Sequence, residues 1–180
     1  GVDSFGTTVS KRNPGGASMK MWLEFFGTGR IFGMDINDAS LLNSERLKTF
    51  VGDQSKSEDI LSVVDSIGGL IDLVIDDGSH ASRHQQETLD LLFPFVQPGG
   101  VYVVEDLHWQ PEHIETASDR KTFDVLQEFS VDGSLDSPSL SDAGATYLRE
   151  WVAGIQFWPV DGRPAKLAIL EKRLDRQTGQ

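Results

Sequence analysis

The sequence predicts an α/β protein with a mostly parallel sheet that ends in an antiparallel hairpin. Between residues 19 and 106, short apolar runs alternate with segments of helical periodicity. These runs are apolar on both faces, as expected of parallel strands that are covered on both sides. Near the C-terminus, "GIQFWPV" and "AKLAILEK" flank "DGRP", a pattern typical of a hairpin.

The first elements follow a polar, glycine-rich start over residues 1–18. "MKMWLEFF" predicts a helix with one apolar face, and "RIFGMDI" at 30–36 predicts a buried strand that ends on Asp35. A second strand is expected at 47–54. The helix that follows, within 55–69, begins at a capping box formed by Ser55 and Glu58 and stops at two glycines.

The middle of the chain continues the alternation. "LIDLVIDD" at 70–77 predicts a strand, and Ser82 with Gln85 is expected to cap a helix that runs to about residue 96. "QPGG" then predicts a turn before the strand at 101–106. Helices are expected near 118–130 and 144–152, and the hairpin strands at 154–159 and 165–172.

Composition bounds the class of protein. With 180 residues, 38% of them hydrophobic, the chain can build one domain with a core, which we expect to span residues 1–180. The absence of cysteine excludes disulfides and cysteine-based zinc sites. A net charge of −12 without a basic stripe argues against nucleic-acid binding. No apolar run approaches the ~20 residues of a membrane span and no signal peptide is recognisable, so we expect no membrane partner and a cytoplasmic location.

Acidic residues gather where the predicted strands end. Ligands bind at the carboxyl ends of strands in an open parallel sheet. If the 70–77 and 101–106 strands are neighbours, several carboxylates share one crevice and repel each other, and a divalent cation would remove that repulsion. Oxygen ligands favour magnesium, manganese or calcium. Consecutive residues point to opposite faces, so Glu105 and Asp106 can share a metal only if the backbone turns there.

The alternative is that these acids are helix caps and solvated loop residues, which is favoured for Asp53. For Asp77, Glu105, Asp106 and the nearby His80, a charge cluster favours function. Two other histidines, 84 and 113, are expected on helix or loop surfaces, and the role of histidine 108 is undecided.

Asp35 has a separate meaning. An acid after the second strand of a nucleotide-binding fold commonly binds ribose hydroxyls, and with the glycine-rich start it suggests an adenosine-containing cofactor.

The chain resembles the metal-dependent S-adenosylmethionine O-methyltransferases that act on macrolide sugars, the mycinamicin and macrocin type. The resemblance rests on "GGASMKMW", "IFGMDI", "GDQS", "VIDDGSH" and "LFPFVQPGGVYVVEDLH", in this order over residues 15–108. It implies a Rossmann-like methyltransferase fold with a C-terminal antiparallel hairpin, with S-adenosylmethionine and Mg²⁺ as cofactors.

The resemblance also assigns roles to individual residues. Asp77, Glu105 and Asp106 match the magnesium ligands, and His80 matches the general base. Residues matching the cofactor-binding segments are Ser18, Asp35, Asp53, Gln54 and Asp76.

Two stretches depart from the family pattern. After "EDLH" the family continues Thr-Ser-Tyr-Trp, whereas this chain has "WQPEHIE" at 109–115, next to the expected acceptor. The acceptor therefore need not be a macrolide sugar. The family also has a strand ending Glu-Ile-Gly-Val before its glycine-rich loop, where this chain offers only Gly1 and Val2. We therefore expect a C-terminal fragment that lacks the first strand, which would lie between the 30–36 and 70–77 strands.

The function that the resemblance implies is Mg²⁺-dependent methyl transfer to a hydroxyl of a sugar or sugar-bearing small molecule, in antibiotic biosynthesis. A homo-oligomer is left open. The alternative is a degenerate or truncated methyltransferase-like partner subunit without activity. An NAD-dependent oxidoreductase ranks lower, because it needs G-x-G-x-x-G after the first strand and the chain offers only Gly1 and Gly6.

Overall fold

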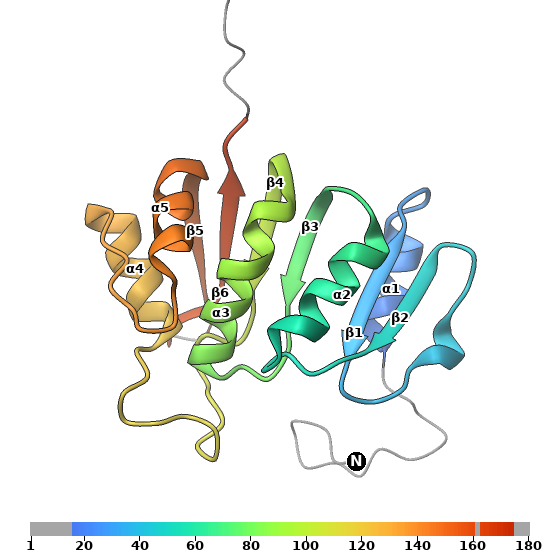
Figure 1. Ribbon diagram of the computed structural model, residues 1–180, viewed down its shortest axis with the longest axis horizontal. Coiled ribbons are helices and arrows are strands. Elements are labelled where there is room, and N and C mark those ends of the chain that lie inside the picture. Colours follow the sequence, from blue (N-terminus) through green and yellow to red (C-terminus); the bar gives the residue numbers. More distant parts are fainter. Residues whose placement is uncertain (1–15, 161–162, 175–180) are drawn as a thin grey trace, which may run out of the picture. The chain divides into compact units, whose positions relative to one another are not determined.

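The computed structural model describes residues 16–160 and 163–174 (Figure 1). The chain forms two compact units, residues 1–67 and 68–180. Most of the glycine-rich start and the centre of the "DGRP" turn lie outside the described residues. No helix in the part that the structure describes combines the length and apolar character needed to cross a membrane.

The first unit contains a parallel pair of strands. Its elements are α1 (Ala17–Phe25), β1 (Ile31–Asp35), the 3-10 helix η1 (Ser40–Leu42), β2 (Leu47–Val51) and α2 (Ser57–Ile67). The pairing runs from Ile31 with Leu47 to Asp35 with Val51. Helix α1 packs closely on β1, since a Cβ at Gly33 would lie 2.7 Å from the sulfur of Met19.

The second unit holds a four-stranded mixed sheet in the order β3-β4-β6-β5. Strands β3 and β4 are parallel, while β6 pairs antiparallel with both β4 and β5. The elements are β3 (Ile71–Asp76), α3 (Ser82–Leu92), the 3-10 helix η2 (Phe93–Phe95), β4 (Val96–Val104), α4 (Thr122–Asp132), α5 (Asp142–Trp151), β5 (Val152–Val160) and β6 (Arg163–Lys172).

Helices α3, α4 and α5 cover one face of this sheet (Figure 1). Burial alternates along β4: Tyr102 and Val104 are fully buried in this core, whereas Val101 and Val103 on the other face are only partly buried. The expectation that both faces are covered is therefore not met for this sheet within the described residues.

The predicted α/β class and the C-terminal hairpin are confirmed, and the break expected between the 30–36 and 70–77 strands divides the predicted sheet in the described part of the chain. The strands form two separately hydrogen-bonded sheets, and no strand joins the β1–β2 pair to β3 there. The expected 82–96 helix also stops early, at Leu92, because Pro94 cannot donate the hydrogen bond that would continue it.

The expected "QPGG" turn is instead the first part of β4. Gly99 has φ 79°, and a Cβ on Gly100 would lie 2.8 Å from the carbonyl oxygen of Asp72. These two glycines let β4 lie close to β3 while the chain bends.

A buried lysine ties β6 to the start of β4. Lys172 is 4% exposed, and its Nζ donates to the carbonyl oxygens of Phe93, Pro94 and Val96 at 3.1, 2.9 and 2.7 Å. The ammonium also lies over the rings of Phe93, Tyr147 and Trp151, 5.0–5.9 Å from their centroids. Three acceptors and an aromatic surround compensate for the loss of water.

Lys172→Met should lower the free energy of unfolding by about 3 kcal/mol, because three buried carbonyl groups lose a charged donor. Urea unfolding measures the change. Lys20→Met, which replaces an exposed lysine of α1, should shift stability by less than about 0.5 kcal/mol. Equal effects of the two substitutions would contradict a structural role for the buried ammonium.

Candidate functional site

The parallel pairing of β3 and β4 brings their acidic ends together. Asp76 is in register with Val104, and the amide of Glu105 donates to the carbonyl oxygen of Asp76 at 2.9 Å. The residues that follow, Asp77 on one strand and Glu105 with Asp106 on the other, therefore emerge at the same edge of the sheet.

The backbone turns sharply at both ends. Asp106 has φ 52° and His80 has φ 59°, both in the left-handed region that residues other than glycine rarely adopt. The turn at Asp106 changes the direction of the chain directly after Glu105, and it is Asp106, not Glu105, that it brings close to Asp77 and His80. A left-handed residue costs roughly 1–2 kcal/mol, and such strain is concentrated at functional sites.

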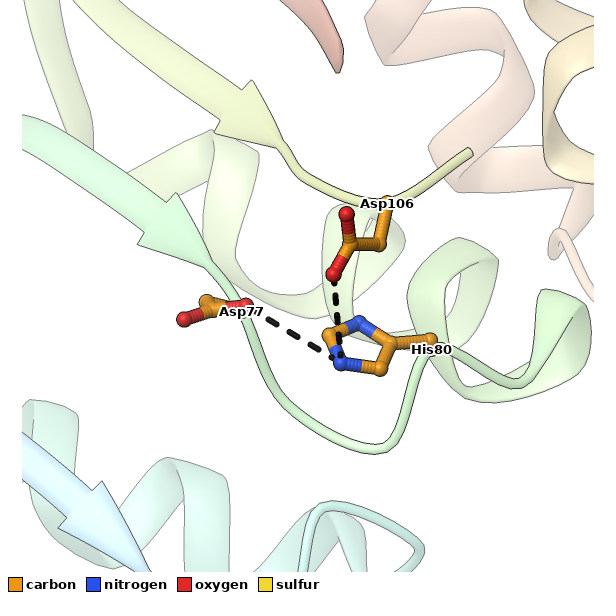
Figure 2. A group of neighbouring side chains, drawn as sticks. All are labelled: Asp77, His80 and Asp106. Atoms are coloured by element: carbon orange, nitrogen blue, oxygen red, sulfur yellow. Dashed lines mark ion pairs between the residues drawn. The ribbon is translucent and has the colours of Figure 1, made fainter. Parts of the chain in front are cut away.

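These turns bring Asp77, His80 and Asp106 into one group (Figure 2). The Nε2 atom of His80 lies 3.9 Å from Oδ1 of Asp77 and 3.7 Å from Oδ2 of Asp106. The His80 side chain is 6% exposed, whereas that of Asp77 is 54% exposed. Within this group, the histidine is therefore buried in the protein and Asp77 is accessible to solvent.

Two carboxyl groups at this edge, those of Asp77 and Glu105, have raised pKa values. Burial raises the pKa of Glu105, and the charges of Asp77 and Asp106 raise it further. Burial also raises the pKa of Asp77, although the neighbouring His80 opposes that shift. Lys166 on β6 lowers both pKa values.

The side chains present fit a divalent cation. One ligand atom from each of Asp77, His80 and Asp106 lies within 4.8 Å of the others. Glu105, the third ligand expected from the sequence, is outside this group but interacts electrostatically with both aspartates. A cation would offset both the burial and the repulsion that raise the pKa values of Asp77 and Glu105.

Two hydrogen bonds to distant parts of the chain fix the segment that follows His80. The spacing of residues in the sequence predicted neither of them. The expected cap by Ser82 and Gln85 is wrong: Gln85 instead donates through Nε2 to the carbonyl oxygen of Glu105 at 2.9 Å. The amide of Ser82 is capped by Oε1 of Glu115 at 2.5 Å, and Glu115 is paired with Lys121 at 2.6 Å. Glu115 comes from the stretch that departs from the family pattern.

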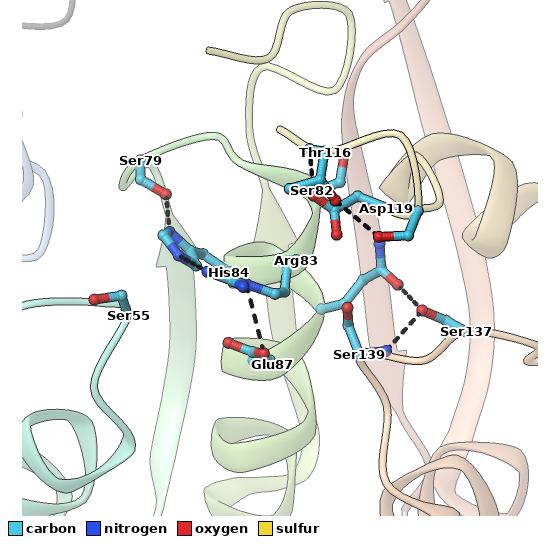
Figure 3. Close-up of polar contacts among 12 residues, drawn as sticks. Ser55, Ser79, Ser82, Arg83, His84, Glu87, Thr116, Asp119, Ser137 and Ser139 are labelled. Carbon is cyan, nitrogen blue, oxygen red and sulfur yellow. Dashed lines mark hydrogen bonds and ion pairs between the residues drawn. The ribbon is translucent and has the colours of Figure 1, made fainter. Parts of the chain in front are cut away.

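The other histidines take different positions. The expectation that His84 lies on the helix surface is wrong, because it is 5% exposed and its Nδ1 lies 2.8 Å from the hydroxyl of Ser79 (Figure 3). His113 is exposed, as expected. His108 lies beside the site, with its Nδ1 3.9 Å from Oδ1 of Asp106.

Asp76 is 6% exposed and stabilises the turn that follows β3. Its Oδ1 accepts from the amide of Gly78 at 3.3 Å. Burial and the Asp76 charge raise the pKa of Tyr102, so its hydroxyl keeps its proton and donates to Oδ2 of Asp76 at 3.5 Å. A direct cofactor contact by this side chain stays a prediction.

The remaining candidates lie in the first unit. Asp35 is exposed at the end of β1, and its Oδ1 accepts from the amide of Asn37 at 2.7 Å. Asp53 accepts from the amide and hydroxyl of Ser55 at 3.0 and 2.7 Å, which orders the turn before α2 and replaces the expected capping box. Gln54 is in that turn, and Ser18 is exposed in the first turn of α1.

Comparison with known proteins finds relatives of one kind. The chain is 36% identical over 170 residues to the 8-demethyl-8-alpha-L-rhamnosyl tetracenomycin-C 2'-O-methyltransferase of Streptomyces olivaceus, covering 92% of this chain and 43% of that enzyme. It is 45% identical over 93 residues to the mycinamicin VI 2''-O-methyltransferase of Micromonospora griseorubida, covering 52% of this chain and 23% of that enzyme. No model of a protein family matches.

Solved structures agree with these relatives. The MycE methyltransferase from the mycinamycin biosynthetic pathway, in complex with Mg and SAH, matches with a TM-score of 0.70 and 30% identity over 95% of this chain and 44% of that one. Its complex with Mg, SAH and mycinamycin VI matches equally well at 28% identity, over 96% of this chain and 44% of that one. The chain thus spans less than half the length of the relatives that it matches.

In the metal-free protein, Glu105→Gln should raise the free energy of unfolding at pH 7 by a few tenths of a kcal/mol, since solvent screens this partly exposed charge. The raised pKa of Glu105 means that the folded state binds more protons than the unfolded state, so stability falls as pH rises past the unfolded pKa. The gain should vanish below about pH 4, where the carboxyl is protonated in both states.

Urea unfolding in EDTA at the two pH values measures this gain. Glu112→Gln, at an exposed position outside the cluster, serves as the control and should show no such pH-dependent gain. A Glu105→Gln protein that is less stable than the wild type at pH 7 would argue against carboxylate repulsion at this edge.

Proposed function

The chain is a homologue of sugar O-methyltransferases of antibiotic biosynthesis, and we propose that the protein transfers a methyl group from S-adenosylmethionine to a hydroxyl of a sugar or sugar-bearing small molecule, with Mg²⁺ as cofactor. The observation that carries the proposal is the meeting of Asp77, His80 and Asp106 where β3 and β4 end. The named relatives act on sugars attached to tetracenomycin and mycinamicin, which supports a glycoside as the acceptor.

In this proposal Asp77, Glu105 and Asp106 hold the magnesium ion, since Mg²⁺ prefers oxygen ligands. When bound, the ion supplies positive charge that favours the ionised form of the acceptor hydroxyl. The imidazole of His80 then remains available as a base, although its Nε2 is close enough to both aspartates to be a ligand instead. If His80 is a metal ligand, its replacement should weaken metal binding. If it is the base, metal binding should remain.

His80 is the proposed proton acceptor. A sugar hydroxyl keeps its proton at neutral pH and is a weak nucleophile, so Nε2 takes the proton as the oxygen attacks the sulfonium methyl. The carbon–sulfur bond breaks as the carbon–oxygen bond forms, leaving S-adenosylhomocysteine and the methyl ether. The surrounding protein buries the imidazole, which limits the motion that the ring loses when the reaction occurs.

We propose that the cofactor is bound by Ser18, Asp35, Asp53 and Gln54, with Asp76 at the end of β3. Asp35 is an exposed carboxylate at the carboxyl end of β1, the position from which an acid binds ribose hydroxyls. We also propose that residues 1–180 serve one methyltransferase domain, because the MycE match extends over 95% of the chain. A non-catalytic partner subunit is the alternative, and the acid and histidine set argues against it.

Removal of metal gives the first test of the proposal. In the full-length protein, EDTA should abolish methyl transfer and Mg²⁺ should restore it. Asp77→Asn should be nearly inactive yet bind S-adenosylhomocysteine with an unchanged dissociation constant in calorimetry, because the metal serves the acceptor. Asp65→Asn, at an exposed position of α2, is the control. Full activity after EDTA treatment would refute the metal requirement.

Replacement of His80 tests the base. His80→Asn should lower the rate by a factor on the order of 10²–10⁴ while Mg²⁺ and cofactor affinities stay unchanged. Asparagine tolerates the left-handed backbone at this position, so the loss would not reflect misfolding. The residual rate should rise with pH as hydroxide replaces the missing base, whereas His113→Asn should behave as wild type. Lost Mg²⁺ binding would instead make His80 a ligand.

Replacement of Asp35 tests the cofactor assignment. Asp35→Ala should weaken S-adenosylhomocysteine binding at least about tenfold, because a charged hydrogen bond contributes roughly 1.5–3 kcal/mol. Calorimetry on the full-length protein measures the dissociation constant. Asp38→Ala removes a nearby carboxylate that accepts from the amide of Ser40, and it should change the constant little. An unchanged constant in folded Asp35→Ala would reject the assignment.

A further inference from the structure

Trp109 is an exposed aromatic side chain on an anchored turn. The side chains on either side, Leu107 and Pro111, are buried, whereas Trp109 is 44% exposed. The amide of Trp109 donates to the carbonyl oxygen of Asp106 at 3.0 Å, and the amide of Leu107 donates to that of Lys166 at 2.9 Å. The turn that carries the candidate ligand Asp106 therefore also presents the indole.

The indole lies edge-on to the candidate base. The ring centroids of Trp109 and His80 are 5.8 Å apart with an interplanar angle of 69°. Shielding of the imidazole would account for this contact. It does not account for the part of the indole that remains exposed, which costs free energy in water unless another apolar surface covers it.

We propose that Trp109 binds the sugar ring of the acceptor by stacking against its C–H face, and so sets which sugar reaches His80; this rests on the proposed function. The reacting hydroxyl must lie within about 2.6–3.2 Å of the base that takes its proton. The sugar ring that carries it is then within reach of an indole 5.8 Å from that imidazole. The electron-rich face of an indole attracts the weakly positive C–H groups of a sugar ring.

The position of Trp109 in the sequence supports a role in specificity. It is the first residue of "WQPEHIE", where the chain departs from the Thr-Ser-Tyr-Trp pattern of the family it resembles. The same stretch supplies Glu115, whose carboxylate caps the amide of Ser82. One segment thus both holds the His80 loop and offers an aromatic surface beside it.

Steady-state kinetics test the proposal with methyl α-L-rhamnopyranoside, S-adenosylmethionine and Mg²⁺ in the full-length protein. Trp109→Ala should raise KM for the rhamnoside about tenfold or more and change kcat less than about threefold. Trp109→Phe should restore most of the affinity, because it keeps an aromatic face. The control is Trp158→Ala, which removes an exposed tryptophan of the edge strand β5 and should leave KM unchanged.

Saturation-transfer NMR with S-adenosylhomocysteine and Mg²⁺ measures binding of the same rhamnoside without turnover. The ring C–H protons should receive saturation from the wild type and from Trp109→Phe, and not from Trp109→Ala. A wild type that fails to bind the rhamnoside, an unchanged KM in Trp109→Ala, or no restoration by Trp109→Phe would overturn the inference.

These results separate the inference from the proposed function. Methyl transfer to the rhamnoside with a KM that does not depend on Trp109 refutes the inference and leaves the proposed function standing. Binding through Trp109 without any methyl transfer refutes the proposed function instead.

Discussion

The parallel pairing of β3 with β4 is the constraint on which the candidate site depends. Because Asp76 and Val104 are in register, the carboxylates that follow the two strands lie close to each other at the same edge of the sheet. The hydrogen bond from the Glu105 amide to the Asp76 carbonyl continues this pairing to the point where the chains diverge. Lys172 holds the other end of β4, so the strand is fixed at both ends.

Several features of this edge of the sheet lower the stability of the folded protein. Two residues, His80 and Asp106, adopt left-handed backbones, and burial together with neighbouring charge raises the pKa values of Asp77 and Glu105. A protein under selection for stability alone would not concentrate these unfavourable terms at one point. Perturbed carboxylates and backbone strain in one place favour function over structure.

The relatives and the geometry support different parts of the functional proposal. Relatives that methylate sugars, and the MycE complexes with Mg and SAH, support the reaction class. The side chains of this chain define where a base and a metal could act. The stretch at 109–115 is where the chain departs from the family pattern, and its Trp109 and Glu115 both contact the His80 loop. If the proposed function holds for this protein, differences in acceptor from its relatives are expected to arise in this stretch.

The sequence by itself determined the local elements and the acids at their ends. Apolar runs predicted β1, β3 and the hairpin, and "VIDDGSH" with "GGVYVVED" identified Asp77, His80, Glu105 and Asp106, because strand periodicity and terminal charges are local properties. Tertiary structure decided which of them meet: Glu105 stands outside the group formed by the other three. Tertiary structure also decided two hydrogen bonds between distant residues. Gln85 bonds to Glu105, 20 residues further along the chain, and Ser82 bonds to Glu115, 33 residues further along. Such contacts depend on the paths of loops and on left-handed turns. Hydrophobic periodicity in the sequence predicts helices and strands, but it does not predict the path of a loop.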